Sequence, residues 1–131
     1  VNLLAGAERP VIIMGTGARE HRDAVIALAE KIDAPVITTL RAKGMIADDH
    51  PLACGVVGRS GTPIASAMMT EADAQLVVGA SFSNHSGIAT WVPTIQVDFD
   101  RMTLGKFHAV DIPLWGEIGT TIGLMDERLG P

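Results

Sequence analysis

Short runs of apolar residues that do not alternate with polar ones constrain the fold of this chain more than any other feature. They lie at residues 10–14, 36–39, 75–78 and 94–97, with a further short run at 110–114. Such runs are typical of strands buried on both faces, because a half-exposed strand shows apolar and polar residues in turn. The sequence therefore predicts an α/β fold in which a parallel sheet lies between two helix layers.

The segments between these runs carry the helical pattern that such a fold needs. Residues 1–10 read as a lead-in with the tail of a helix, and residues 40–60 show no period and are predicted as mostly loop. Thr62 and Pro63 suit the start of a middle helix, with Thr62 as its N-cap and Pro63 at its first position. Apolar residues at helical spacing predict one helix over residues 19–32 and another from about Glu117: Val25, Leu28, Ala29 and Ile32, then Ile118, Ile122, Met125 and Leu129.

Length and charge narrow the class of protein. The 131 residues match one domain, and 15 acidic against 10 basic residues leave a net charge of −5. This balance argues against nucleic acid or an anionic membrane as partner, because the basic excess that drives such binding is missing. Cys54 is the single cysteine, so the chain has no internal disulfide and no cysteine-built zinc site. We expect a cytoplasmic protein, in which Cys54 packs among apolar neighbours.

Small and polar residues gather where the predicted strands end, and this is the edge at which open α/β sheets bind ligands. A backbone without bulky side chains lets a phosphate approach the amide N–H groups. These strand ends therefore predict a nucleotide site. Its candidate residues are Gly15, Thr16, Gly17, Thr38, Thr39, Leu40, Gly58, Arg59, Ser60, Gly61, Gly79, Ala80, Ser81, Phe82, Asp98 and Phe99.

Each of these features also has a plain structural interpretation. The turn at Gly15 and Gly17 lacks the third glycine of the dinucleotide fingerprint, because Glu20 stands there, so it is either a phosphate turn or only a tight strand-to-helix turn. The loop at residues 58–61 is either an anion cradle or an ordinary glycine loop. Asp98 either contacts a ribose or adenine or is a solvated strand-end acid. No catalytic residue is predicted, since Ser81 and Ser83 do not complete a nucleophile motif. No set of metal ligands is predicted either.

Several short segments follow one another in a recognisable order. They are R-P-V-I-I-M-G-T-G-A at residues 9–18, A-P-V-I-T-T at 34–39, V-V-G-A-S-F at 77–82 and I-Q-V-D-F-D at 95–100. As a set they resemble the central domain of thiamine-diphosphate enzymes, the family of acetolactate synthase, pyruvate oxidase, glyoxylate carboligase and related decarboxylases. The resemblance implies a three-layer α/β/α, Rossmann-like domain over residues 1–131, with a six-stranded parallel sheet of the deoxyhypusine synthase type. Residues 1–8 would be a linker or the remnant of a leading helix.

The resemblance also implies partners and cofactors. In this family thiamine diphosphate and Mg²⁺ are held by the two domains that flank the central one, and neither the activating glutamate nor the Gly-Asp-Gly…Asn motif of those domains is found here. The chain would then not be catalytic by itself, and its partners would be the missing thiamine-binding domains and further copies of itself.

In the flavin-binding members of the family this domain holds FAD in an extended pose. Carried over by position, the turn at Gly15 to Gly17 meets the phosphate or ribose region, and Asp98 and Phe99 lie at the adenine end. Thr38 to Leu40 line the flavin, residues 58–61 approach the diphosphate, and residues 79–82 flank the adenosine.

This chain departs from acetolactate synthases at one of these places. Those enzymes carry Arg-Phe-Asp-Asp-Arg where S-F-S-N-H stands at residues 81–85. The loss of that arginine argues against FAD, so ADP and a CoA-type nucleotide stay open as ligands beside it. Two other functions also stay open, namely a ligand-free assembly domain and a stand-alone NAD-binding domain.

Overall fold

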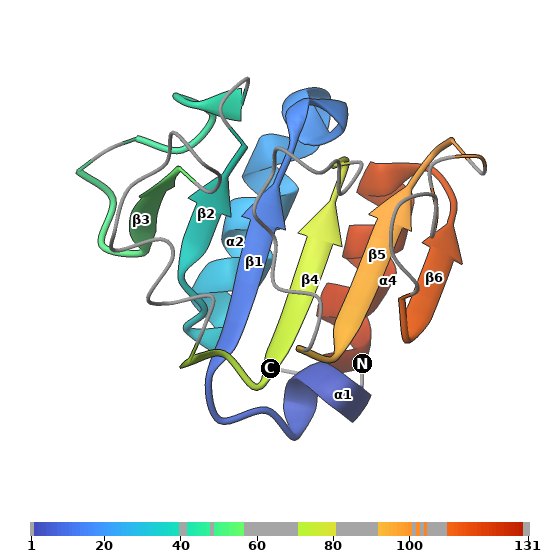
Figure 1. The fold of residues 1–131 in the computed structure, drawn as a ribbon. Helices are drawn as coiled ribbons and strands as arrows, with labels where there is room; N and C mark the ends of the chain where they lie inside the picture. The colour runs from blue at the N-terminus through green and yellow to red at the C-terminus, as the bar shows by residue number, and fades with distance from the viewer. Residues whose placement is uncertain are drawn as a thin grey trace.

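The computed structural model describes residues 2–39, 42–47, 49–56, 71–80, 92–100, 102, 104 and 110–129. Figure 1 shows the elements in chain order. They are α1 (Asn2–Ala5), β1 (Pro10–Met14), the 3₁₀ helix η1 (Thr16–His21), α2 (Arg22–Ile32), β2 (Val36–Thr38), β3 (Ala53–Val56), β4 (Ala74–Val78), β5 (Thr94–Asp98), β6 (Ile112–Trp115) and α4 (Ile118–Leu129).

The strands form one six-stranded sheet in the order β3-β2-β1-β4-β5-β6, and every neighbouring pair is parallel. This confirms the predicted parallel sheet and the Rossmann-like class. The chain leaves β1 toward β2 on one side and later continues from β4 toward β5 on the other. The order therefore reverses between β1 and β4, and ligands of open α/β sheets bind beyond the strand ends at such a reversal.

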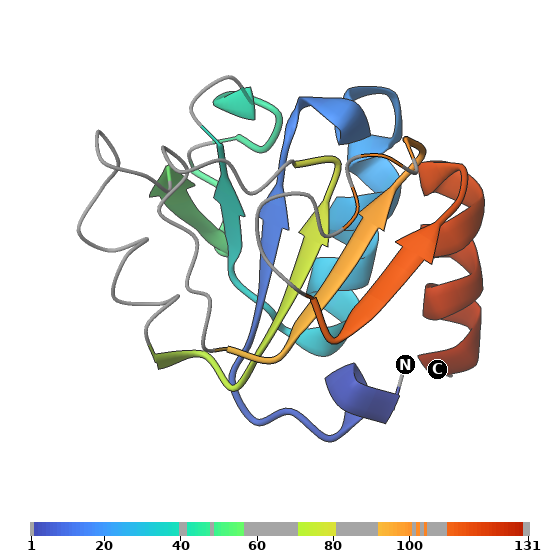
Figure 2. The same ribbon diagram turned by 45° about the vertical axis from the view of Figure 1, so that its right-hand side comes forward.

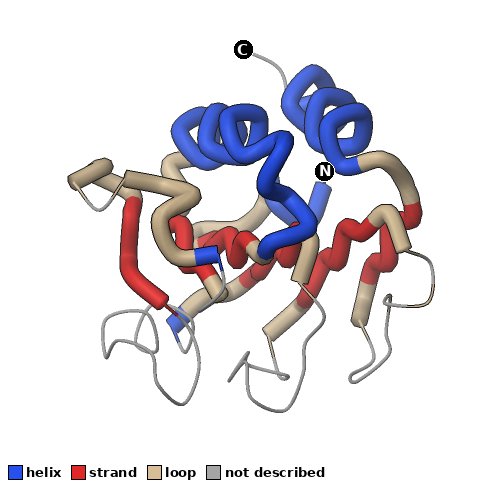
Figure 3. Tube along the Cα trace, turned by 90° about the horizontal axis from the view of Figure 1, so that it is seen from above, coloured by secondary structure: helices blue, strands red, loops and turns tan. Residues whose placement is uncertain are grey.

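Strands β1, β2, β4 and β5 are buried on both faces, as expected for a three-layer α/β/α fold, whereas the edge strand β6 is mostly exposed. Helices α2 and α4 lie side by side on one face (Figures 2 and 3). On that face Ile12, Leu76 and Ile95 join the buried apolar residues of the two helices in one core. On the other face Ile13 and Val77 belong to a second buried cluster. The apolar residues predicted for α2 and α4 face the first core: Val25, Leu28, Ala29, Ile118, Ile122 and Met125 are buried, and Ile32 and Leu129 are partly buried against it.

The prediction of a loop over residues 40–60 is wrong in one place, because β3 lies within it. β3 is an edge strand that pairs with β2 through a shifted register. It contains Gly55, whose φ of 92° is a left-handed conformation that no regular strand pattern includes. Gly55 interrupts the apolar residues of this short edge strand, so the sequence shows no continuous run like those of the inner strands.

The helix predicted from residue 19 also differs, since α2 begins at Arg22 and is preceded by η1. The Ala18 N–H donates to the Gly15 carbonyl at 3.1 Å, which is the tighter i to i−3 bond of a 3₁₀ turn. The Gly17 N–H is drawn away to the Gly79 carbonyl at 3.1 Å. The first turn of η1 is thus held against the end of β4.

The remaining sequence expectations concern the middle helix and the ends of the other elements. The middle helix predicted after Thr62 lies outside the described residues. The strands predicted at 75–78, 94–97 and 110–114 appear as β4, β5 and β6 within two residues at each end. Within the described part of the chain, none of the helices combines the length and apolar character needed to cross a bilayer.

Candidate functional site

The turns that follow β1 and β4 are in backbone contact at the point where the strand order reverses. A Cβ atom on Gly17 would lie 2.9 Å from the Gly79 Cα, and one on Gly79 would lie 2.5 Å from the Ala18 nitrogen. Gly79 also has a φ of +67°. These glycines are therefore required by the close approach of the two turns, whatever else the turns do.

The same contact uses the amide groups that a phosphate would need. The Gly15 N–H donates to the Val78 carbonyl at 2.9 Å, and the Gly17 N–H donates to the Gly79 carbonyl. The structure thus favours the tight-turn interpretation for these two glycines. A phosphate at this turn would have to use other donors, such as the Thr16 hydroxyl or the Arg19 guanidinium.

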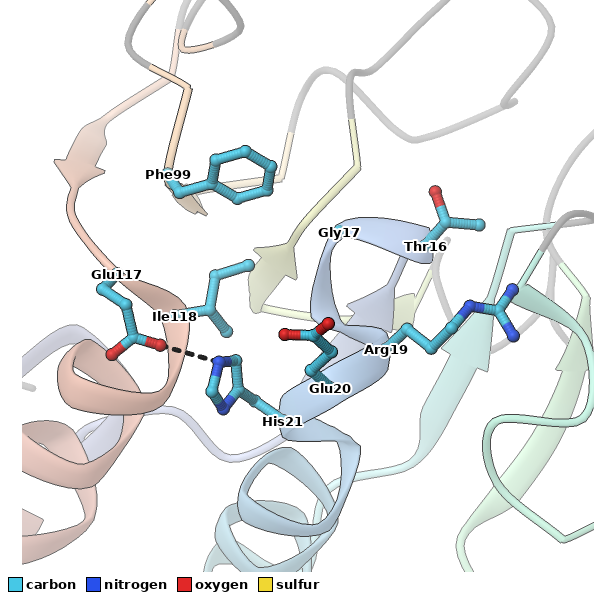
Figure 4. Close-up of a pocket in the computed structure, with 8 residues that line it drawn as sticks. All are labelled: Thr16, Gly17, Arg19, Glu20, His21, Phe99, Glu117 and Ile118. Carbon is cyan, nitrogen blue, oxygen red and sulfur yellow. Dashed lines mark ion pairs between the residues drawn. The ribbon is translucent and has the colours of Figure 1, made fainter.

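A pocket of about 520 Å³ lies beside this contact, between η1 and the start of α4 (Figure 4). Its volume falls in the range of roughly 300–1,000 Å³ that is usual for small-molecule sites. It opens at the carboxyl edge of the sheet, where the fold predicts a ligand. Its described lining residues are Thr16, Gly17, Arg19, Glu20 and His21 from η1, Phe99 after β5, and Glu117 and Ile118 at the start of α4.

Glu117 is held in one position by the helix that it caps. Its Oε1 accepts the Gly119 N–H at 2.9 Å, and its Oε2 accepts the Thr120 N–H at 2.8 Å and the Thr120 hydroxyl at 2.6 Å. The Thr120 hydroxyl and these backbone groups lower the pKa of Glu117 from its ordinary 4.5 to about 2. The pocket therefore contains a fixed carboxylate that is ionised at any physiological pH.

His21 reaches across the pocket to this carboxylate. Its Nε2 lies 2.7 Å from the Glu117 Oε1. The imidazole also packs on the first turn of α4, since a Cβ atom on Gly119 would lie 2.6 Å from its Nδ1. One contact thus joins the η1 wall of the pocket to its α4 wall.

Phe99 and Ile118 form the apolar wall. The Phe99 residue is 61% exposed, and its carbonyl accepts the Trp115 indole N–H at 3.1 Å. The preceding Asp98 is only 5% exposed, so it is not the solvated strand-end acid of one sequence interpretation. Its Oδ1 accepts the Asp100 N–H at 2.9 Å, and burial raises the pKa of its carboxyl group. Asp98 thus shapes the turn that presents Phe99.

The structure brings three of the predicted site residues together in this pocket, namely Thr16, Gly17 and Phe99. The others that it describes lie at neighbouring strand ends and do not line the pocket: Gly15, Thr38, Thr39, Gly79, Ala80 and Asp98. The rest lie outside the described residues: Leu40, Gly58, Arg59, Ser60, Gly61, Ser81 and Phe82.

Sequence reasoning missed five residues of the lining. The sequence marks Glu20 only as the residue that breaks the dinucleotide fingerprint, and it predicts no role for His21. A usable signal existed for Glu117, because it follows the last strand and opens a helix, as ligand-binding residues of such sheets do. The five are Arg19, Glu20, His21, Glu117 and Ile118.

The lining suits binding better than chemistry. It offers an aromatic ring, a hydroxyl, a guanidinium and two carboxylates, and its imidazole is already paired with a carboxylate. Outside the pocket, burial raises the pKa of the Cys54 thiol, which lowers its reactivity at neutral pH. The described lining therefore places hydrogen-bonding, charged and apolar groups side by side.

Known proteins match the chain along nearly its whole length. Residues 1–125 match the family described as "Thiamine pyrophosphate enzyme, central domain". A probable acetolactate synthase large subunit of Methanococcus aeolicus is 36% identical over 127 residues, which are 89% of this chain and 21% of that protein. The acetolactate synthase isozyme 1 large subunit of Escherichia coli K12 is 33% identical over 121 residues, 88% of this chain and 22% of that protein.

A third relative carries a broader name. The putative thiamine pyrophosphate-containing protein YdaP of Bacillus subtilis is 35% identical over 104 residues, which are 79% of this chain and 18% of that protein. The chain thus spans about a fifth of the length of these relatives. With its parallel sheet and its strand-end pocket, the chain belongs to the thiamine pyrophosphate enzyme family, as a central domain.

Proposed function

We propose that this chain serves as the central domain of an acetolactate synthase-like carboligase or decarboxylase and binds the nucleotide part of a cofactor in the pocket between η1 and α4. The observation that carries the proposal is the pocket itself. It lies at the carboxyl edge of the sheet and combines an exposed aromatic ring with polar and charged groups. This is the lining that a base, a ribose and a phosphate together require.

The lining also suggests how a nucleotide would lie. Phe99 and Ile118 offer one apolar wall, which fits the flat face of a base. The Arg19 guanidinium extends away from that wall, on the side of Thr16 (Figure 4). The base would then lie at the end of β5 and the diphosphate at the turn after β1. This direction agrees with the one that the family resemblance implies, and it suits FAD, ADP or a CoA-type nucleotide.

Thiamine diphosphate has a separate place in the proposal. When bound, it supplies the carbanion chemistry of the parent enzyme, with Mg²⁺ on its diphosphate. The described residues of this chain do not fit the role of holding thiamine diphosphate and Mg²⁺. The imidazole in the pocket between η1 and α4 is paired with a carboxylate, and the carboxylates there bind helix N–H groups or face solvent. The 131 residues would act as one domain that positions a nucleotide and packs against the thiamine-binding domains, in the cytoplasm and in an oligomer.

The test is a binding measurement with a matched pair of variants. Calorimetry and thermal melting with ADP, FAD, CoA and NAD are run on the 131-residue chain, on Arg19→Gln and on Arg22→Gln. Arg22 is an exposed residue of α2 that does not line the pocket. At a hundred times its dissociation constant a ligand stabilises the chain by roughly 2.7 kcal/mol. We expect the unmodified chain to bind at least one of these nucleotides, and we expect Arg19→Gln but not Arg22→Gln to weaken that binding. No response to any of the four nucleotides at millimolar concentration would contradict the proposal.

A second candidate function is supported by a separate observation. Phe99, Met102 and Trp115 are 61%, 78% and 65% exposed. The Trp115 indole N–H donates to the Phe99 carbonyl, which joins the ends of β5 and β6. Exposed apolar side chains gathered in this way are typical of a docking surface. If the chain is a ligand-free assembly domain, it self-associates in sedimentation experiments and Trp115→Ser weakens that association. A monomer at every concentration would argue against this alternative.

A further inference from the structure

Two carboxylates face the pocket, one on each wall, and they are bound in different ways. Both oxygens of Glu117 already accept hydrogen bonds from the first turn of α4. Glu20 lies on η1, is exposed, and points its carboxylate into the space between the two walls (Figure 4). Glu20 is therefore the carboxylate that is placed to accept hydrogen bonds from a ligand.

The nearby basic side chains, Arg19 and His21, do not lie free beside the Glu20 carboxylate. The Arg19 guanidinium points away from Glu117, on the side of Thr16 (Figure 4), and the His21 Nε2 is paired with Glu117 at 2.7 Å. The region beside Phe99 thus presents two carboxylates, one of which stays ionised because the pKa of Glu117 is about 2. A ligand group that carries its own negative charge would be repelled there, whereas a hydroxyl group could donate a hydrogen bond to the Glu20 carboxylate.

A ribose next to the Phe99 wall brings its two hydroxyl groups to this region. A carboxylate can accept both hydroxyl hydrogens, as acidic residues in dinucleotide sites accept from a ribose. The same carboxylate opposes a phosphate on either hydroxyl, because like charges in close contact cost free energy. Specificity of this kind comes from the repulsive element as much as from the attractive one.

We propose that Glu20 is a specificity-determining residue that selects nucleotides with an unmodified ribose diol and rejects those with a 2′- or 3′-phosphate. This inference rests on the proposed function, because it needs a nucleotide in the pocket. It narrows the three candidate ligands to the ADP moiety, free or within FAD, and excludes the 3′-phosphorylated nucleotide of CoA.

The test compares two probes that differ only by one phosphate. Dissociation constants of ADP and of adenosine 3′-phosphate 5′-diphosphate are measured by calorimetry on the 131-residue chain, on Glu20→Gln and on Glu30→Gln. Glutamine keeps an acceptor oxygen and removes the charge. Glu30 is an exposed glutamate of α2 that does not line the pocket, so it serves as the matched control.

We expect the unmodified chain to prefer ADP by about tenfold or more, which corresponds to about 1.4 kcal/mol. Glu20→Gln should bring the two constants within about threefold of each other, Glu20→Arg should reverse the preference, and Glu30→Gln should leave it unchanged. The preference should also shrink in high salt, because salt screens charges at an exposed site.

The outcomes separate this inference from the one on which it depends. If both probes bind the unmodified chain equally, or if Glu20→Gln leaves the preference intact, the role of Glu20 is wrong and nucleotide binding stands. If neither probe binds at millimolar concentration, both the inference and the proposed function fall. A thermal melt of each variant in the absence of ligand confirms that the exposed substitutions leave the fold intact.

Discussion

The imidazole Nε2 of His21 lies 2.7 Å from the Oε1 of Glu117, and this contact connects the end of η1 to the start of α4. The two segments form opposite walls of the pocket (Figure 4). Neither residue could face the other without the sheet, which places the residues after β1 and those after β6 at the same edge. The shape of the pocket therefore depends on a tertiary contact between an imidazole and a carboxylate at its rim.

Acid should weaken the contribution of Glu117 to stability. Its pKa in the folded chain is about 2, below the ordinary 4.5, so the ionised form favours the folded state. That contribution is fully present above about pH 4.5 and is lost as the pH falls toward 2. Urea unfolding of the unmodified chain and of Glu117→Gln should therefore show a stability difference that is largest near neutral pH and shrinks in this window. A difference that is the same at every pH would show that the ionised carboxylate does not matter.

Two glycines of α4 should respond in opposite ways to the same substitution. Gly123→Ala meets no atom within 4 Å and should stabilise the chain by about 0.5–1 kcal/mol, because alanine favours a helix. Gly119→Ala places its Cβ 2.6 Å from the His21 Nδ1, so it should displace the imidazole from Glu117 and lower stability. Denaturant midpoints of the two variants provide the comparison.

A double variant identifies the cause of the Gly119 effect. In a His21→Ala background the ring is gone, and Gly119→Ala should no longer carry its penalty. If Gly119→Ala is harmless in the unmodified chain, or equally harmful without His21, then the packing of the imidazole on α4 is not what requires a glycine there.

The contact between the turns after β1 and β4 should be intolerant of any side chain. In Gly79→Ala a left-handed backbone would be combined with a Cβ atom 2.5 Å from the Ala18 nitrogen. We expect a loss of about 2–4 kcal/mol, from the strained backbone together with overpacking. Gly123→Ala is again the control for a glycine with open space around it. An unchanged midpoint for Gly79→Ala would mean that the two turns are not held against each other in solution.

Asp73 should stabilise the opposite edge of the sheet. Its two carboxylate oxygens accept the Glu8 and Arg9 N–H groups at 2.7 and 2.9 Å, which ties the entry to β1 to the entry to β4. The Glu8 N–H is the main reason why the pKa of Asp73 lies below its ordinary 3.8. Asp73→Ala should lower the unfolding midpoint at neutral pH, and the loss should fade as the pH falls below 3.8. A loss that persists undiminished in acid would contradict this role.

Local pattern and tertiary contact explain which parts of the fold could be predicted. The bounds of β1 are predicted to the residue because all five of its side chains are buried, so its apolar run is complete. In the edge strand β3 the apolar residues are interrupted by Gly55, which has a left-handed conformation. The start of α2 could not be placed, because the Gly17 amide is taken by the Gly79 carbonyl, and no local pattern contains that contact.

The same distinction applies to the candidate site. Thr16 and Phe99 could be predicted, because each follows a recognisable strand of a parallel sheet. Glu20 and His21 could not, since their roles arise only when α4 is placed opposite η1. The pairing of His21 with Glu117 needs the sheet order, and the sequence shows no pattern that links the two residues.

The central claim is that the pocket between η1 and α4 receives a nucleotide, and amide NMR spectra during a titration with ADP test it most directly. We expect saturable shifts at Glu20, Phe99 and Ile118, which line the pocket, and none at Cys54 on the far edge strand β3. Saturable shifts confined to β3 or to the far end of α2, or a spectrum unchanged at millimolar ADP, would contradict it.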